Sequence, residues 1–315
     1  MSIEPLVNDQ EEIIYKSNNI GQLKDYDSAY GAMDYEAVLN EFDGLGDGKY
    51  NIAYEAVDRH CIGNKKDKLA LLFIDGAGRK ENITFNMLRQ ESNRLAQGLS
   101  SIGVAKGDRV FAFLPRIPEV YYSAIAIPKV GAIFGPLFSA FGPEAVKDRL
   151  AASGAKVLIT TVDLWERVAH IASQLPELAK VIIVGEGTLK SEDGNVSTME
   201  FIKYRDLVAD CGTEFTPIAM DLEDPFIIHY TSGSTGKPKG VTHVHKAMLG
   251  HYQTAKWVLD LSDEDLFWCT ADPGWVTGTS YGVFGPWLNG VSQVVYGGGF
   301  DAVSWYKVIE ENKVT

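Results

Sequence analysis

FIIHYTSGSTGKPKGV, from Phe226 to Val241, is an apolar run that changes abruptly into small, hydroxylated and basic residues. Its opening residues are mostly β-formers, which predicts a buried strand that ends near Tyr230. The oxygens of a polyphosphate need closely spaced backbone N–H groups, hydroxyl donors and positive charge. The residues after the strand offer all three: Thr231, Ser232, Gly233, Ser234, Thr235, Gly236, Lys237 and Lys239. The stretch therefore predicts a phosphate-binding loop.

Two other interpretations of this loop fit less well. A Walker A loop needs four residues between its first glycine and the Gly-Lys pair, but only two separate Gly233 from Gly236. Pro238 also lacks the N–H that the interior of a following helix would use. A flexible surface loop would explain the composition, but it would explain neither the buried strand before the loop nor the Lys-Pro-Lys-Gly sequence after it.

Short apolar segments alternate with amphipathic ones before this loop. Such alternation predicts an α/β fold, with parallel-rich sheets covered by helices on both faces. The expected strands are residues 69–74, 109–114, 132–138, 156–161 and 181–184, with a returning strand from residue 82. The expected helices are residues 51–61, 85–102, 118–130, 143–153, 162–174, 198–211, 246–259 and 304–312. Thr84 should cap the second of these helices, and Pro128 should kink or end the third.

The ends of the chain and one internal segment follow a different pattern. Residues 1–50 are acidic and polar with a few aromatic side chains, which predicts an extended arm with short helices that packs on a body over residues 51–315. Residues 186–197 are polar and contain glycine, so we expect a surface loop. We find no internal repeat and no low-complexity tract.

Composition excludes several classes of protein. A net charge of −13 argues against a broad basic face for nucleic acid. The N-terminus is not a secretory signal, and no apolar run reaches the roughly 18 residues of a membrane span. Cys61, Cys211 and Cys269 are few and far apart, which indicates neither disulfides nor a zinc site. We therefore expect a cytoplasmic protein with no membrane or nucleic-acid partner, and nothing in the sequence indicates its oligomeric state.

Several segments together resemble one family. YTSGSTGKPKGV, at residues 230–241, resembles the signature loop of the acyl-adenylate-forming enzymes, and KWVLDLSDEDLFWCTADPGWVTGTSYGVFGPWLNG, at residues 256–290, is similar to the acetyl-CoA synthetase branch of that superfamily. EAVDRH, ITFNMLRQESNRLAQGL, KGDRVFAFLPR and GPLFSAFGPEAVKDRL also resemble that branch. The resemblance covers the chain from about residue 51 to its end.

The resemblance implies a reaction and a role for the loop. Members of the family use Mg-ATP to activate a carboxylate as an acyl adenylate, release pyrophosphate, and transfer the acyl group to coenzyme A. The loop residues Thr231–Lys237 and Lys239 would bind the ATP phosphates, with Thr231 and Lys237 assisting the departure of pyrophosphate through position and charge. ATP, Mg²⁺, coenzyme A and acetate are the implied cofactors and substrates.

The resemblance also implies an acyl pocket and coenzyme A contacts. In DPGWVTG, at residues 272–278, Trp275 and Val276 would wall a small acyl pocket, and Thr277 would lie beside the coenzyme A arm. The segment from Phe138 to Phe141 matches one that contacts the nucleotide end of coenzyme A. Family members often have glycine in the middle of that segment, where this chain has Ser139 and Ala140. Arg167 is the only candidate for a basic coenzyme A contact.

Two histidines near the loop are weaker candidates. His243 and His245 share a face only in a strand, and no third ligand lies at a recognisable interval, so we expect no protein-bound metal. The resemblance places them behind the phosphate loop as structural or pocket-lining groups.

The end of the sequence limits the prediction. Residues 314–315 read as the start of a strand, and the adenine, ribose and catalytic lysine segments of the family, with its small C-terminal domain, would lie later. We therefore expect the N-terminal part of an acetate–CoA ligase that is not active alone. Propionate or another short acid stays open as the substrate, as does a non-catalytic nucleotide- or coenzyme A-binding module.

Overall fold

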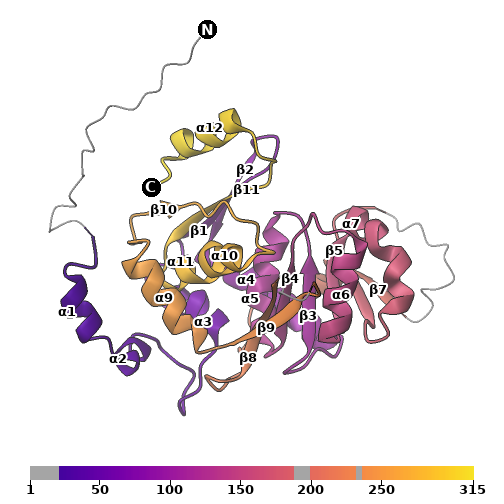
Figure 1. Cartoon of the computed structure of the whole chain (residues 1–315), viewed down its shortest axis with the longest axis horizontal. Helices are drawn as coiled ribbons and strands as arrows, with labels where there is room; N and C mark the ends of the chain where they lie inside the picture. Colours follow the sequence, from indigo (N-terminus) through magenta and orange to yellow (C-terminus); the bar gives the residue numbers. More distant parts are fainter. Residues whose placement is uncertain (1–20, 188–198, 232–235) are drawn as a thin grey trace, which may run out of the picture.

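The computed structural model of the chain describes residues 21–187, 199–231 and 236–315, which form two sheets layered with helices (Figure 1). Four residues of the predicted phosphate loop, Ser232, Gly233, Ser234 and Thr235, lie outside the described residues. Most of the loop expected over residues 186–197 also lies outside them.

A seven-stranded sheet carries the predicted phosphate loop. Its strand order is β7-β6-β5-β3-β4-β8-β9, and every neighbouring pair is parallel except β8 and β9. The strands are β3 (Arg109–Phe113), β4 (Ile133–Leu137), β5 (Val157–Thr161), β6 (Lys180–Val184), β7 (Glu200–Lys203), β8 (Pro225–Thr231) and β9 (Lys239–Val244). The predicted parallel-rich α/β fold is confirmed.

Helices cover both faces of this sheet, as predicted. Alternate residues of β3 separate the two cores: Val110 and Ala112 pack toward α4 and α5, whereas Phe111 and Phe113 pack toward α6 and α7. The first face holds α4 (Phe85–Ser101), α5 (Pro118–Lys129) and α8 (Tyr204–Ala209). The second holds α6 (Pro143–Ser153), α7 (Val162–Val168) and the 3₁₀ turn η2 (Ala169–Gln174).

A second, four-stranded sheet lies next to the first (Figure 1). Its strands, in spatial order, are β10 (Leu266–Phe267), β11 (Ser292–Tyr296), β1 (Leu69–Ile74) and β2 (Lys80–Thr84). The β1–β2 hairpin was predicted, and so was the cap of α4, where the hydroxyl of Thr84 accepts from the Met87 N–H at 3.2 Å. Helix α12 (Ala302–Asn312) covers this sheet through Val308 and the half-buried Trp305.

One nearly continuous helical run packs against α9 (Ala247–Trp257) and the second sheet. It consists of α10 (Val276–Thr279), the π-helical turn η3 (Ser280–Phe284) and α11 (Gly285–Leu288). Trp287 is fully buried, and its indole N–H donates to the Ala70 carbonyl of β1 at 3.0 Å. The run therefore has a fixed position relative to both sheets.

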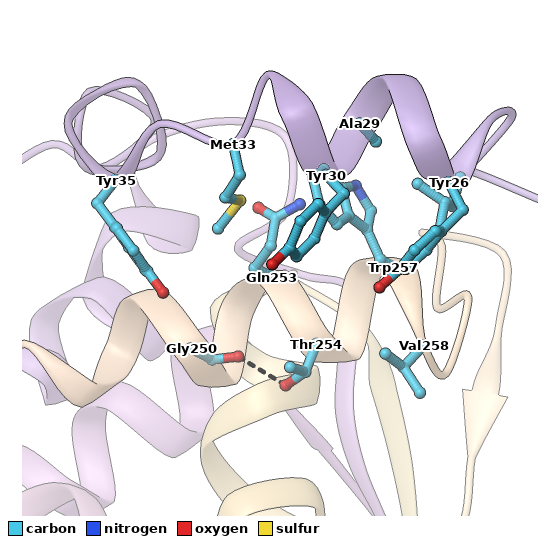
Figure 2. A pocket seen from close by; sticks show the side chains of 11 residues that line it. Tyr26, Ala29, Tyr30, Met33, Tyr35, Gly250, Gln253, Thr254, Trp257 and Val258 are labelled. Carbon is cyan, nitrogen blue, oxygen red and sulfur yellow. Dashed lines mark hydrogen bonds between the residues drawn. The ribbon is translucent and has the colours of Figure 1, made fainter.

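The described part of the N-terminal arm forms two short helices, α1 (Tyr26–Gly31) and α2 (Tyr35–Leu39), and the body begins with α3 (Ile52–Ala56) and the 3₁₀ turn η1 (Asp58–Cys61). Tyr26 and Tyr30 extend from α1 toward Trp257 of α9 and line a groove of about 250 Å³ (Figure 2). The carboxylate of Glu41 accepts from Lys256 Nζ of α9 at 2.9 Å.

Two details differ from the sequence-based expectations. Residues 199–203 were expected to be helical, but Glu200–Lys203 is the edge strand β7, where Phe201 pairs with Val181 and packs on the Trp165 ring at 5.2 Å. Strand β9 was not expected. Val241 and Thr242 are β-branched, and the hydrogen bonds to β8 complete a hairpin at the sheet edge.

Candidate functional site

The β8–β9 hairpin places the described residues of the predicted phosphate loop at one end of the large sheet. Thr231 is the last residue of β8 and pairs with Lys239, the first residue of β9. Gly236 has φ +84°, a left-handed conformation that favours glycine, and Lys237 is exposed. A Walker A loop leads into a helix, whereas this loop leads into an antiparallel strand.

An aromatic cluster brings two predicted site segments together. The rings of Phe138 and Trp275 are 5.4 Å apart, and Phe141 lies 5.6 Å and 5.8 Å from them. Gly274 permits this contact, because a Cβ there would lie 2.2 Å from the backbone nitrogen of Phe138. Trp275 remains 46% exposed, so the cluster presents an aromatic surface to solvent.

Two arginines border this cluster. The Arg149 guanidinium lies 4.2 Å from the Phe141 ring centre and 5.7 Å from that of Tyr230, within cation–π distance of both. Arg167 Nη1 donates to the Ser139 carbonyl at 2.7 Å. The turn that contains Phe138 and Phe141 is therefore flanked by positive charge.

The Asp272–Gly274 turn sets the position of Trp275. The carboxylate of Asp272 accepts from the Gly274 N–H at 2.9 Å and forms an ion pair with Arg116 at 3.6 Å. Burial raises the pKa of Asp272 above its usual value. Beyond the turn, Val276 is 43% exposed and Thr277 is also exposed, so the predicted pocket residue and the predicted coenzyme A contact are both accessible to solvent.

One hydrogen bond joins the strand that leads into the phosphate loop to this turn. His229 of β8 and Thr279 of α10 are both buried, and His229 Nε2 lies 2.7 Å from Thr279 Oγ1. Thr279 Oγ1 also donates to the Val276 carbonyl at 3.0 Å. Strand β8, which leads into the predicted phosphate loop, is therefore in direct contact with α10, the helix that follows Trp275.

His243 and His245 do not form the centre of a described metal site. His245 is fully buried, and its Nδ1 accepts from the Ile52 N–H at 3.0 Å, which is a structural role. The His243 ring lies 5.7 Å from the His229 ring. Over residues 21–187, 199–231 and 236–315, no three His, Cys, Asp or Glu side chains come together as a ligand set.

Acid is expected to destabilise the fold through His229 and His245. Burial lowers the pKa of His229 to about 3 and that of His245 to about 4. An unfolded chain, with histidine pKa values near 6.5, binds more protons between about pH 4 and 6.5, so stability is lost as the pH falls through this window. We expect a loss of about 1 kcal/mol per histidine between pH 6.5 and 5.5.

Denaturant unfolding of the chain at pH 7.5, 6.5 and 5.5 measures this loss. His229→Gln should reduce the pH dependence relative to the parent chain. Equal pH dependence in His229→Gln and in the parent would show that His229 does not contribute to it.

Three contributors to the site were not singled out from the sequence. His229 interrupts an apolar strand, which is a visible signal, because a histidine there needs a partner when buried. The hydroxyl of Thr279 and the guanidinium of Arg149 carry no such signal. Their roles depend on contacts between elements far apart in the chain.

Comparison with known proteins agrees with this geometry. The family model described as "AMP-binding enzyme" matches residues 57–315, and the chain belongs to that family. An acetyl-coenzyme A synthetase of Bacillus subtilis (strain 168) is 49% identical over 92% of this chain and 49% of its own length. Another, from Methanothrix thermoacetophila, is 38% identical over 85% of this chain and 42% of its own length. The resemblance to the acetyl-CoA synthetase branch is thus confirmed.

A solved structure supports the fold. A Brucella canis acyl-CoA synthetase matches with a TM-score of 0.82 and 32% identity, over 92% of this chain and 51% of that one. The chain spans about half the length of the curated relatives that it matches. Among the helices that the structure describes, none combines the length and the apolar character needed to cross a bilayer.

Proposed function

We propose that this chain supplies the phosphate loop and part of the acyl pocket of an AMP-forming acetate–CoA ligase. The observation that carries the proposal is the hydrogen bond from His229 to Thr279. It joins β8, which leads into the predicted phosphate loop, to α10, which follows Trp275, and this contact supports the proposal that both predicted substrate segments belong to one site. The relatives from Bacillus subtilis and Methanothrix are named acetyl-coenzyme A synthetases, which favours acetate as the acid.

The reaction has two steps. A carboxylate oxygen of acetate attacks the α-phosphorus of Mg-ATP, the bond to the bridging oxygen breaks, and pyrophosphate leaves. The sulfur of coenzyme A then attacks the acyl carbon of the acetyl adenylate, loses its proton, and displaces AMP. In this proposal Thr231, Gly236, Lys237 and Lys239 bind the phosphates with Ser232, Gly233, Ser234 and Thr235, and Lys237 and Thr231 stabilise the charge of the leaving pyrophosphate.

Trp275 and Val276 would limit the length of the acid. A methylene group is worth only about 1–3 kcal/mol in an apolar pocket, so the bulk of these side chains favours a short acid. Thr277 would lie beside the coenzyme A arm. Phe138 would contact the nucleotide end of coenzyme A, where Arg149 and Arg167 add positive charge beside the aromatic rings.

The arrangement of the chain and its location are also proposals. Residues 1–50 would be an extension that packs on the body, and residues 51–315 the N-terminal part of the adenylation domain. The three cysteines are free thiols, as expected for the cytoplasmic location that we infer. Small molecules, and neither nucleic acid nor a membrane, would be the partners.

ATP–pyrophosphate exchange tests the proposal. We expect no acetate-dependent exchange from residues 1–315 alone. Exchange should occur when this chain is followed by the second half of the Bacillus subtilis relative, because that half would supply the remaining groups of the site. Propionate should support slower exchange than acetate.

The same assay separates the alternatives. Faster exchange with propionate than with acetate would indicate that the acid substrate is propionate or another short-chain acid. An extended polypeptide that is folded by circular dichroism but shows no exchange with either acid would contradict the enzyme proposal. Tight calorimetric binding of ATP or coenzyme A by the 315-residue chain would then favour a binding module.

A further inference from the structure

His229 is an unusual residue for the centre of strand β8. Its neighbours in the strand, Phe226, Ile227 and Ile228, are apolar, and its own side chain is only 4% exposed. A buried imidazole costs free energy unless its polar atoms have partners. Nε2 has a partner in Thr279 Oγ1 at 2.7 Å, whereas Nδ1 has no hydrogen-bond partner among residues 21–187, 199–231 and 236–315. Within this described part of the chain, the His229 side chain is therefore held by one hydrogen bond.

The direction of this hydrogen bond follows from the groups around it. If Nδ1 carried the proton, a buried N–H would be left without an acceptor, which is rarer in proteins than a bare lone pair. We therefore assign the proton to Nε2, which then donates to Thr279 Oγ1. The Thr279 hydroxyl is then free to donate to the Val276 carbonyl at 3.0 Å. Two successive hydrogen bonds, with the donors in the same direction, therefore connect β8 to the first turn of α10.

The two ends of this hydrogen-bonded series lie in the two segments to which the proposed function assigns substrates. His229 is two residues before Thr231, where the phosphate loop begins, and the Val276 carbonyl belongs to the proposed wall of the acyl pocket. Gly278 permits close packing of α10 on the preceding turn, because a Cβ there would lie 1.9 Å from the Asp272 carbonyl oxygen. We therefore expect a change in the His229 hydrogen bond to move the wall relative to the end of β8.

We propose that His229 is a positioning residue that fixes the acyl-pocket wall relative to Thr231, at the end of β8, in the position that in-line attack by a small acid requires. This inference rests on the proposed function and adds a specificity determinant to it. His229 is not a general base in this role, because its only free nitrogen is buried against the protein and not in the open site.

Three substitutions test the inference in the extended polypeptide described above. His229→Phe keeps a planar ring but removes the donor, Thr279→Val keeps the shape but removes the acceptor, and His229→Gln keeps an amide donor. A hydrogen bond worth about 1 kcal/mol predicts that each of the first two raises the KM for acetate about fivefold. The KM for Mg-ATP should stay within about twofold, and the preference for acetate over propionate should fall.

Two further results are expected from the same set. The double variant should be no worse than either single variant, because both remove one shared interaction. His229→Gln, which keeps a donor, should have a KM for acetate close to that of the parent. If His229→Phe and Thr279→Val leave the KM for acetate and the acid preference at the parent values, the inference is wrong while the proposed function stands. If the unsubstituted extended polypeptide itself shows no acetate-dependent ATP–pyrophosphate exchange, the proposed function is wrong.

A second measurement needs no activity and uses the 315-residue chain. Hydrogen–deuterium exchange should become faster in peptides that cover residues 275–284 in His229→Phe and in Thr279→Val. It should not change in peptides that cover β3, which serves as the internal control. Unchanged exchange over residues 275–284 in both variants would overturn the positioning role, whatever the outcome of the kinetic assay.

Discussion

Replacing Lys129 with methionine is expected to lower the free energy of unfolding by about 3–5 kcal/mol. Lys129 is fully buried, and its Nζ lies 2.7 Å from the Asp58 carboxylate, 2.7 Å from Asn93 Oδ1 and 3.0 Å from Ser92 Oγ. Burial lowers the pKa of Lys129 and raises that of Asp58, so desolvation works against both charges. Removing the lysine leaves Asp58 buried without its counter-ion.

Urea unfolding followed by circular dichroism measures this effect in the 315-residue chain. Lys65→Met is the matched control, because the Lys65–Asp263 pair at 2.7 Å is partly exposed and should contribute no more than about 1 kcal/mol. Adding Asp58→Asn to Lys129→Met should recover part of the loss, because the buried charge is gone. Equal losses in the free energy of unfolding for Lys129→Met and Lys65→Met would show that the buried ion pair contributes no more to stability than the exposed one.

Lys237→Ala is expected to slow acetate-dependent ATP–pyrophosphate exchange about 10²- to 10³-fold in the extended polypeptide, if the proposed function is right. The positive charge would no longer stabilise the leaving pyrophosphate, so the effect should fall on the rate and not on the KM for acetate. Lys237 is exposed beside Gly236 at the open end of the hairpin, so its loss should not destabilise the fold.

Lys246→Ala provides the control for Lys237→Ala. Lys246 is an exposed lysine that pairs with Glu223 at 3.3 Å, a short distance beyond the hairpin. Its removal changes the net charge by the same amount but should leave the exchange rate within about twofold. A similar loss of rate in both variants would indicate a general electrostatic effect and remove Lys237 from the phosphate site.

The sequence predicted most strands of the large sheet because each is a short apolar run between polar turns. Residues 109–114 and 156–161, for example, were expected to be strands, and β3 and β5 lie within them. The order of the strands was not predictable in the same way, since it depends on pairings between distant segments. The edge strand β7 was missed because it has only four residues. Four residues are too few to distinguish the alternating apolar pattern of a strand from the pattern of a helix.

Only part of the candidate site could be named from the sequence, because its other contacts also join distant segments. The resemblance named Phe138 and Trp275, and the structure brings these rings together. It could not reveal the His229–Thr279 contact, which joins residues 50 positions apart. Lys129 shows the same limit, because its partners Asp58 and Asn93 come from other elements. The roles predicted for all the site residues stay predictions, and Ser232, Gly233, Ser234 and Thr235 also lie outside the described residues.

Strand β9 also has a consequence for how molecules of this protein meet one another. It is one edge of the seven-stranded sheet, and an exposed edge can recruit strands from other copies. Lys239, at its start, and Lys203, on the opposite edge strand β7, place charge at both borders, which disfavours such pairing. A neutral substitution at Lys239 would therefore weaken the protection against aggregation as well as the proposed phosphate binding, so light scattering should accompany every activity measurement on such a variant.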